Sequence, residues 1–302
     1  MAANMEELFA DCLTRPLLLN EPMSRHTSFK IGGPAEALAE PANEEELALL
    51  LARAGAAQVP VTIIGNGSNL LVRDKGVAGL VIKLGRYFAT VRQEGQDLIF
   101  GSGLSLAQAS MEAAKAGLTG MEFAVGIPGT VGGAVYMNAG AYDGEMSAVV
   151  KSVLVMDYMG QVRELGLKEL DLSYRHSALQ GAKLLVTRVR VSLQKGDREA
   201  IKAKMADFSQ RRLSKQPLEL PSAGSTFKRP QGYFAGTLID QTGLKGYTVG
   251  GAQVSTKHAG FVVNIGGATA SDVLQLIKDV QERVFAAHGV RLEPEVLVIG
   301  QE

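Results

Sequence analysis

Two clusters of glycine constrain the fold of this chain more than any other feature of its sequence. Glycine accounts for 35 of the 302 residues, about 12% against a usual ~7%. The first cluster, residues 65–69, follows the apolar run Val61 to Ile64, and the second places six glycines within residues 126–144. Because glycine tolerates positive φ and lets a ligand approach the main chain closely, such clusters predict binding loops built from backbone.

The first cluster, Gly65-Asn66-Gly67-Ser68-Asn69, is typical of a loop that holds an anion. Successive amides in a turn of this kind can form a concave nest, and Ser68 and Asn69 add side-chain donors. A tight turn between two strands remains the alternative explanation for so short a pattern.

The second cluster interleaves its glycines with apolar side chains, a pattern that suits a backbone lying against a flat ligand. A glycine-rich contact between two helices is the alternative. The G-x-G-x-x-G pattern is absent, because Leu70 stands where the third glycine belongs after Gly65 and Gly67, and Leu106 does so after Gly101 and Gly103. No G-x-x-x-x-G-K-[ST] motif occurs. We therefore expect a cofactor that carries a pyrophosphate on a scaffold other than the Rossmann fold.

Charge and composition exclude several classes of protein. The formal net charge is zero, which gives no electrostatic reason to expect nucleic acid or an anionic membrane surface as a partner. No apolar run approaches the roughly 20 residues of a membrane helix, and the N-terminus lacks the apolar core of an export signal. Cys12 is the single cysteine, and the four histidines share no metal-ligand spacing. We expect a cytoplasmic protein without a metal.

Mixed patterns of helix and strand predict an α+β fold rather than a repeated βαβ fold. Alternating apolar residues mark residues 185–193 as a half-buried strand. Further strands are expected at 61–64, 77–84, 98–100 and 296–299, and helices at 43–55, 105–116, 197–213 and 271–289. The change in pattern near Lys195 predicts two domains, residues 1–195 and 196–302.

Polar residues in the second half of the chain are candidates for chemistry. Ser225 stands beside flexible Gly224, Arg175 lies between two expected strands, and Glu295 precedes the last strand. Each also has an ordinary explanation, as a turn serine, a surface charge or a solvated carboxylate. Residue type alone does not choose between these interpretations.

Six motifs in order carry a family resemblance that runs from about Leu19 to Gly300. They are GNGSNLLVRD, GIPGTVGGAVYMNAGAYDGE, YRHS, PSAGSTFKRP, GLKGYTVGGAQVSTKHAGFVVN and LEPEV. Together they resemble the UDP-N-acetylenolpyruvoylglucosamine reductases, which complete UDP-N-acetylmuramate for peptidoglycan. The resemblance implies an FAD-binding domain of the vanillyl-alcohol-oxidase type, made of two α+β subdomains, and a smaller α+β substrate domain after it. It also implies non-covalent FAD and NADPH as the hydride donor.

The resemblance assigns roles to individual residues. Arg175 and Glu295 would stabilise the enolic intermediate, and Ser225 would donate a proton to it. Lys215 would meet the UDP diphosphate, Arg229 is a further substrate-binding candidate, and Tyr142 is the candidate that covers the UDP moiety. Solvated surface charges are the alternative explanation for Lys215 and Arg229. The expected cofactor-binding residues are Ile64, Gly65, Asn66, Gly67, Ser68, Asn69, Leu70, Gly126, Ile127, Pro128, Gly129, Thr130, Gly132, Gly133, Asn138 and Gly140.

Some positions depart from the family pattern. Leu297 replaces a usual arginine, and Thr256 precedes Lys257-His258 where proline or glutamate is common. Only about 20 residues separate Arg175 from the helix expected at Asp197, which resembles the shorter form that lacks an inserted tyrosine loop. Two alternatives stay open: a different flavin enzyme on the same scaffold, such as a sugar or alcohol oxidase, and a non-catalytic protein that binds nucleotide sugars.

Overall fold

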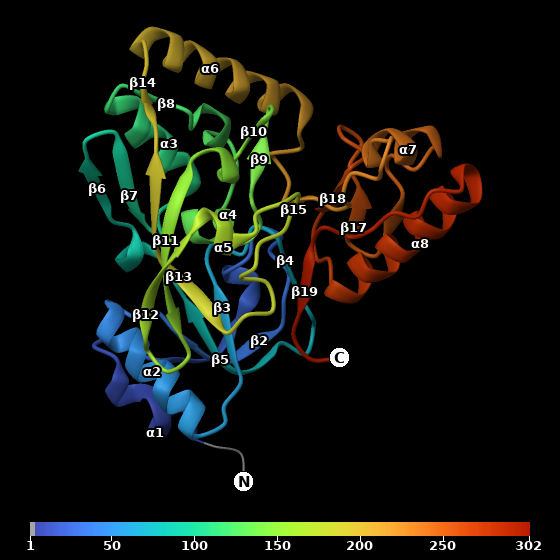
Figure 1. Cartoon of the computed structure of the whole chain (residues 1–302). Coiled ribbons are helices and arrows are strands. Elements are labelled where there is room, and N and C mark those ends of the chain that lie inside the picture. Colours follow the sequence, from blue (N-terminus) through green and yellow to red (C-terminus); the bar gives the residue numbers. More distant parts are fainter. Residues whose placement is uncertain (1–3) are drawn as a thin grey trace. The chain divides into compact units, whose positions relative to one another are not determined.

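Short strands alternate with helices throughout residues 4–302, the part of the chain that the computed structural model describes (Figure 1). The first three residues of the N-terminal segment, where we expect no export signal, lie outside that part. The α-helices are α1 (Met5–Phe9), α2 (Glu44–Ala56), α3 (Leu106–Lys115), α4 (Val131–Tyr136), α5 (Leu167–Leu170), α6 (Arg198–Lys215), α7 (Ala235–Gln241) and α8 (Ala270–His288). No helix among these residues has both the length and the apolar character needed to cross a bilayer.

The chain forms two compact units, and each unit is built from three separate segments of the sequence. One unit comprises Met1–Leu19, Ala37–Asn66 and Gly79–Arg211, and the other comprises Asn20–Glu36, Gly67–Ala78 and Arg212–Glu302. The division expected at residue 195, which concerns the domains of the family, stays a prediction.

The strands of the first unit build its largest sheet, in the order β12-β11-β13-β7-β6. These strands are β6 (Val91–Glu94), β7 (Asp97–Gly101), β11 (Val150–Asp157), β12 (Val162–Gly166) and β13 (Leu184–Ser192). Every pair in the sheet is antiparallel, with Val189 opposite both Phe100 and Val153. The alternation expected for residues 185–193 is confirmed, because Leu185, Val189 and Val191 are buried.

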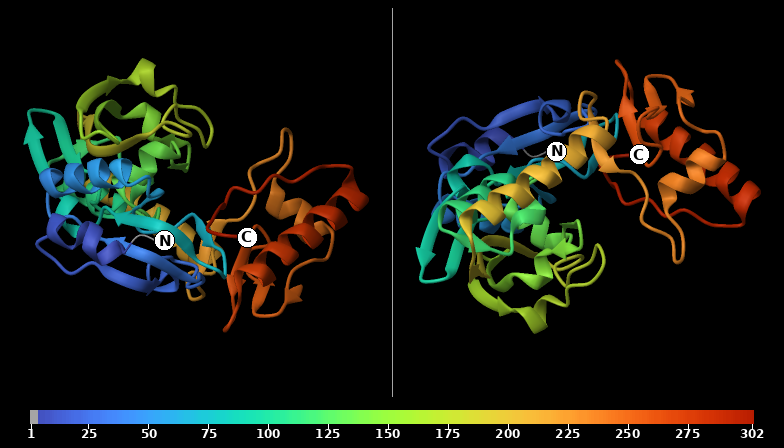
Figure 2. Two further views of the ribbon diagram at one scale, coloured as in Figure 1. Left: turned by 90° about the horizontal axis from the view of Figure 1, so that it is seen from below. Right: turned by 90° about the horizontal axis from the view of Figure 1, so that it is seen from above.

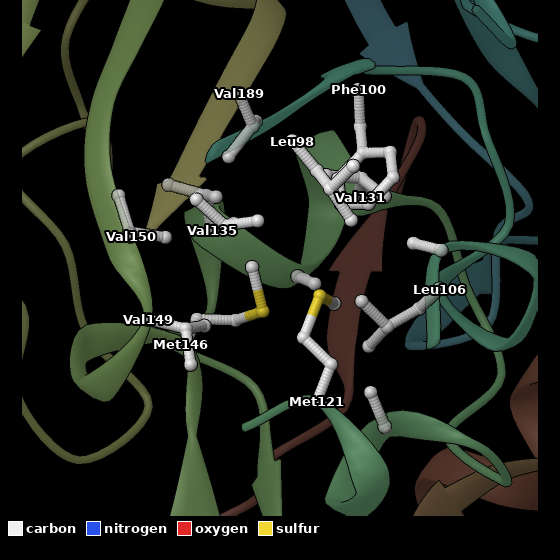
Figure 3. Close-up of a cluster of buried hydrophobic side chains, with 14 of the residues drawn as sticks. Leu98, Phe100, Leu106, Met121, Val131, Val135, Met146, Val149, Val150 and Val189 are labelled. Atoms are coloured by element: carbon white, nitrogen blue, oxygen red, sulfur yellow. The ribbon is translucent and has the colours of Figure 1, made fainter. Parts of the chain in front are cut away.

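Helix α4 packs on this sheet and fills the core of the first unit. Figure 3 shows Val131 and Val135 of α4 directed towards Val189 of β13 and Phe100 of β7. The sequence did not predict this helix, which lies inside the second glycine cluster. Thr130 begins it, since its side chain accepts a hydrogen bond from the Gly133 amide.

A second, four-stranded sheet has the order β1-β2-β5-β3. Its strands are β1 (Leu18–Pro22), β2 (Pro34–Ala39), β3 (Val61–Ile64) and β5 (Val77–Lys83), so the strand expected at 61–64 is confirmed. Helix α2 begins at its cap Asn43 as expected, but it continues through Gly55 and ends at Ala56. The chain instead turns at Gln58, which has a φ of 55°, so the expected stop at Gly55 was wrong.

The second unit contains a sheet of order β15-β18-β17-β16 and the strand pair β19-β4. These strands are β4 (Leu70–Val72), β15 (Ser222–Ser225), β16 (Thr248–Val249), β17 (Ala252–Val254), β18 (Phe261–Asn264) and β19 (Leu297–Ile299). Helix α8 runs beside α7 (Figure 2) and buries Val273, Ile277 and Val280. A capping box at Thr269 begins α8, and Gly289 ends it in the left-handed conformation.

Short strand pairs complete the first unit. They are β9 (Gly140–Ala141) with β10 (Gly144–Glu145), and β8 (Leu118–Thr119) with β14 (Gln194–Lys195). The β9–β10 hairpin lies within the second glycine cluster, so this cluster is a helix followed by a hairpin rather than one open loop.

Candidate active site

Gly65, the first residue of the first glycine cluster, contacts the second glycine cluster within the first unit. Gly65 follows β3 and Thr130 caps α4, and a Cβ added to Gly65 would lie 2.5 Å from Thr130 Oγ1. No side chain fits at residue 65 without displacing Thr130. Two segments that are far apart in the sequence therefore lie side by side, as a joint cofactor site requires.

The first cluster offers unused backbone donors. Within the described residues, the amides of Gly65, Asn66, Gly67 and Asn69 donate to no protein group. Gly67 has a φ of 61°, a conformation that favours glycine. A run of open amides is the donor set that a pyrophosphate needs, so this cluster fits FAD.

The amides at the start of α4 are already occupied. Those of Val131 and Gly132 donate to the carbonyl oxygens of Leu104 and Ser102 at 2.8 and 2.9 Å. The Gly133 amide donates to Thr130 Oγ1 at 3.3 Å. The start of this helix is therefore not an open anion site, and the expected part of the second cluster in binding the cofactor stays a prediction.

Two neighbouring glycines of the second cluster differ in what surrounds them. A Cβ at Gly132 would lie 2.8 Å from the Cβ of Ser102, so protein packing already excludes a side chain there. A Cβ at Gly133 would meet only Thr130 Oγ1, at an ordinary 3.5 Å, and the residue is exposed. The fold therefore leaves space beside Gly133 that is open to a ligand.

Ser102 is a polar residue that the sequence reasoning missed. It is 2% exposed, and its hydroxyl has no hydrogen-bond partner among the described residues. Its carbonyl oxygen accepts the Gly132 amide, which places it beside the second cluster. Its position between Gly101 and Gly103 was the available signal.

Arg175 occupies a strained turn in the first unit. Ser173 and His176 exchange backbone hydrogen bonds of 3.1 and 3.0 Å, so Tyr174 and Arg175 form a two-residue turn. Arg175 has a φ of 56°, which usually belongs to glycine or asparagine at this position. Its guanidinium carbon lies 5.2 Å from the centre of the Tyr174 ring. An arginine in a strained turn indicates a functional constraint.

Asn138 supports this turn from the second cluster. Its side-chain amide donates to the Ser173 carbonyl at 3.1 Å, and its side-chain oxygen accepts the Ser147 amide at 2.9 Å. Asn138 is 1% exposed, with a φ of 41°. Its expected part in holding the cofactor stays a prediction.

Ser225 and Glu295 are brought together in the second unit. The Glu295 amide donates to the Thr226 carbonyl at 2.8 Å, and Phe227 pairs antiparallel with Pro294. Ser225 is exposed at the end of β15, and Glu295 is half-buried. The Asn69 side chain donates to the Glu295 carbonyl at 3.0 Å, which joins the end of the first glycine cluster to this carboxylate's backbone.

The three expected substrate-binding residues have different surroundings. Lys215, the last residue of α6, is exposed. The guanidinium of Arg229 lies 4.0 Å from the centre of the Phe234 ring. The Tyr142 ring stacks on Phe208 at 4.4 Å, and its hydroxyl donates to the Phe208 carbonyl at 3.1 Å. These roles stay predictions.

His258 contacts the strand that pairs with the Ser225 strand. Its ring contacts Phe261 edge to face, and Phe261 pairs with Ser225. Burial lowers the pKa of His258, and the charges of Lys245 and Lys215 act in the same direction. No group of three or more potential metal ligands occurs among residues 4–302.

Two family models match the chain. Residues 35–166 match a model described as an FAD binding domain. Residues 216–299, which include Ser225 and Glu295, match the C-terminal domain of UDP-N-acetylenolpyruvoylglucosamine reductase.

Relatives match along nearly the full length. The UDP-N-acetylenolpyruvoylglucosamine reductase of Caldanaerobacter subterraneus subsp. tengcongensis is 51% identical over 286 residues, which are 95% of this chain and 94% of the relative. The crystal structure of the reductase from Thermus caldophilus matches with a TM-score of 0.81 and 41% identity, over 94% of this chain and 98% of that one.

A more distant likeness concerns the fold alone. A solvent-stable cholesterol oxidase is 15% identical and has a TM-score of 0.51, over 64% of this chain and 40% of its own. Together with the FAD-binding model, these matches confirm the expected α+β fold with an FAD-binding domain of the vanillyl-alcohol-oxidase type.

Proposed function

This chain belongs to the family of UDP-N-acetylenolpyruvoylglucosamine reductases, and from that premise we propose which of its residues perform the reaction. The reaction is the NADPH-dependent reduction of the enolpyruvyl group of UDP-N-acetylglucosamine-enolpyruvate to UDP-N-acetylmuramate, a peptidoglycan precursor. FAD is the cofactor. The pairing of the Ser225 and Glu295 segments through Thr226 is the structural observation that carries the assignment of the catalytic residues.

The residues of the two glycine clusters fit FAD. The open amides of Gly65, Asn66, Gly67 and Asn69 would bind the pyrophosphate, and the exposed face at Gly133 would lie against the flavin nucleotide. When bound and reduced by NADPH, FAD supplies a hydride to the terminal carbon of the enolpyruvyl double bond. The protein must then stabilise negative charge on the substrate and supply one proton.

Ser225 is proposed as the proton donor. Ser225 is an exposed residue at the end of β15, next to Gly224, whose φ is 77°. The hydroxyl proton would pass to the carbon beside the substrate carboxylate, so that hydride and proton together saturate the double bond. A serine is a weak acid, and the basicity of the enolate drives the transfer.

Arg175 and Glu295 are proposed to stabilise the enolic intermediate. A guanidinium offers paired donors to a carboxylate, and the substrate carboxylate gains charge as the hydride arrives. The strained backbone at Arg175 supports a role that a surface arginine would not explain. The half-buried Glu295, in its protonated form, would donate a hydrogen bond to the same carboxylate.

Further residues are proposed for the nucleotide part of the substrate. Lys215 would meet the diphosphate, Arg229 would also bind the substrate, and Tyr142 would cover the UDP moiety in place of the missing tyrosine loop. We propose residues 1–195 as the FAD-binding domain and residues 196–302 as the substrate domain. We place the enzyme in the cytoplasm, where NADPH and the nucleotide sugar are made.

Steady-state kinetics test this function directly. The purified protein should be yellow, release FAD on denaturation, and oxidise NADPH only when the enolpyruvyl nucleotide sugar is present. Turnover with oxygen and an alcohol or sugar substrate would instead identify an oxidase on the same scaffold. A colourless protein that binds the nucleotide sugar without turnover would identify a non-catalytic binding protein.

A further inference from the structure

Gln180 connects the turn that carries Arg175 to the end of helix α4. Its side-chain nitrogen donates to the carbonyl oxygen of Arg175 at 3.0 Å and to that of Tyr136 at 3.0 Å. A carboxamide has two N–H groups, so one side chain satisfies both acceptors. Gln180 is half-buried in the first unit, together with all of its partners.

The carbonyl of Tyr136 is available to accept hydrogen bonds from side chains because it lies at the end of a helix. Tyr136 is the last residue of α4, and the final carbonyl groups of a helix have no partner inside the helix. Ser177 donates its hydroxyl to the same oxygen at 2.7 Å. The segment after the Arg175 turn therefore caps the helix of the second glycine cluster.

The Arg175 turn needs such an anchor because its backbone is strained. A non-glycine residue with a φ of 56° persists when its surroundings determine the conformation. Asn138 donates to the carbonyl of Ser173, which directly precedes the turn, and Gln180 donates to the carbonyl of Arg175 itself. Of these two side chains, Gln180 is the one that bonds to the main chain of the arginine.

We propose that Gln180 is a positioning residue for the reaction, because its carboxamide fixes the backbone of Arg175 to the C-terminal end of α4. This inference rests on the proposed role of Arg175 with the substrate. It predicts that Gln180 matters for the half-reaction in which reduced enzyme meets the enolpyruvyl substrate. Because Arg175 is proposed to act on the substrate carboxylate, the half-reaction with NADPH should be insensitive to Gln180.

Gln180→Met tests the link, because methionine has a similar length but no donor. We expect the holoenzyme to keep its FAD and its rate of reduction by NADPH. Its reoxidation by the enolpyruvyl substrate should slow by about ten- to a hundredfold, the scale of a small misplacement of a catalytic group. Gln180→Asn, which keeps the carboxamide but shortens its reach, should show the same split and replaces Gln180→Met if that variant does not fold.

Ser177→Ala is the matched control. It removes a hydrogen bond to the same Tyr136 carbonyl but leaves the bond from Gln180 to Arg175 in place. We expect a lower melting temperature with a reoxidation rate within about twofold of the wild type. If Ser177→Ala and Gln180→Met slow reoxidation equally, Gln180 only caps α4 and the inference is wrong.

A double-mutant cycle gives the decisive comparison. Once Arg175→Ala has been made, Gln180→Met should slow reoxidation no further, because nothing is left to position. A full additional loss in that background would overturn the inference. If Arg175→Ala slows reoxidation and Gln180→Met alone does not, only the inference fails. If Arg175→Ala has no effect, the proposed role of Arg175 fails and the inference fails with it.

Discussion

The amide of Glu295 donates to the carbonyl oxygen of Thr226 at 2.8 Å, and this one hydrogen bond aligns two segments that lie far apart in the sequence. Thr226 is itself fixed, since its hydroxyl accepts the Val262 amide at 3.0 Å and its own amide donates to the Gly260 carbonyl at 2.9 Å. The hydrogen bonds of Thr226 therefore fix the backbone next to Ser225 and at Glu295. The chemistry proposed for them depends on this support.

Glu295→Gln tests whether the reaction requires the carboxyl group of Glu295 or only a side chain of its size. Glutamine keeps the size of the side chain and one carbonyl oxygen but removes the carboxyl group. We expect reoxidation by the enolpyruvyl substrate to slow by about a hundredfold, in line with the loss of a group that stabilises developing charge. FAD content and reduction by NADPH, followed by flavin absorbance, should stay unchanged. A variant that releases FAD would show that Glu295 supports the fold instead.

Gly133→Ala and Gly132→Ala should have opposite effects. Alanine at residue 133 meets no close protein atom and favours helix by up to about 1 kcal/mol, so the apoprotein should unfold at the same or a higher temperature. Its dissociation constant for FAD should rise by about tenfold or more. Alanine at residue 132 collides with Ser102 and should lower the free energy of unfolding by about 1–3 kcal/mol. Unchanged FAD affinity in Gly133→Ala would contradict the placement of the cofactor.

His258 should make the stability of the protein depend on pH. Burial lowers its pKa in the folded state, so the unfolded chain takes up a proton at a pH where the folded protein does not. The free energy of unfolding should therefore decrease as pH falls below about 6.5, the usual pKa of histidine. His258→Gln should flatten the curve in that window, as measured by urea denaturation at several pH values. An equal slope in the variant would show that other groups cause the dependence.

The sequence predicted those features that depend on local pattern. The strand Val61–Ile64 leads into Gly65 as expected, and Gly289 ends the last helix as expected, although that helix begins at Ala270 rather than at Ser271. Helix α4 escaped prediction because Gly132 and Gly133 disfavour helix, and packing against the sheet outweighs that preference. Thr130 as a capping residue was the available signal.

The contacts that build the site depend on the tertiary fold and could not be read from residue type. Arg175, Ser225 and Glu295 were indistinguishable from ordinary polar residues until the family resemblance selected them. The bonds from Gln180 and Asn138 to backbone carbonyls join segments whose proximity no spacing rule predicts. The chain also passes between the two units several times, whereas the single change in sequence pattern near Lys195 indicated only one boundary.

Stopped-flow comparison of the two half-reactions of Ser225→Ala tests the central claim most directly. Ser222→Ala, a change of the same size on the same strand, serves as the control. We predict that Ser225→Ala is reduced by NADPH at nearly the wild-type rate and is reoxidised by the enolpyruvyl substrate more slowly by orders of magnitude, because the proton donor is gone. An equal loss in both half-reactions, or none in either, would contradict the assignment of Ser225 and with it the proposed active site.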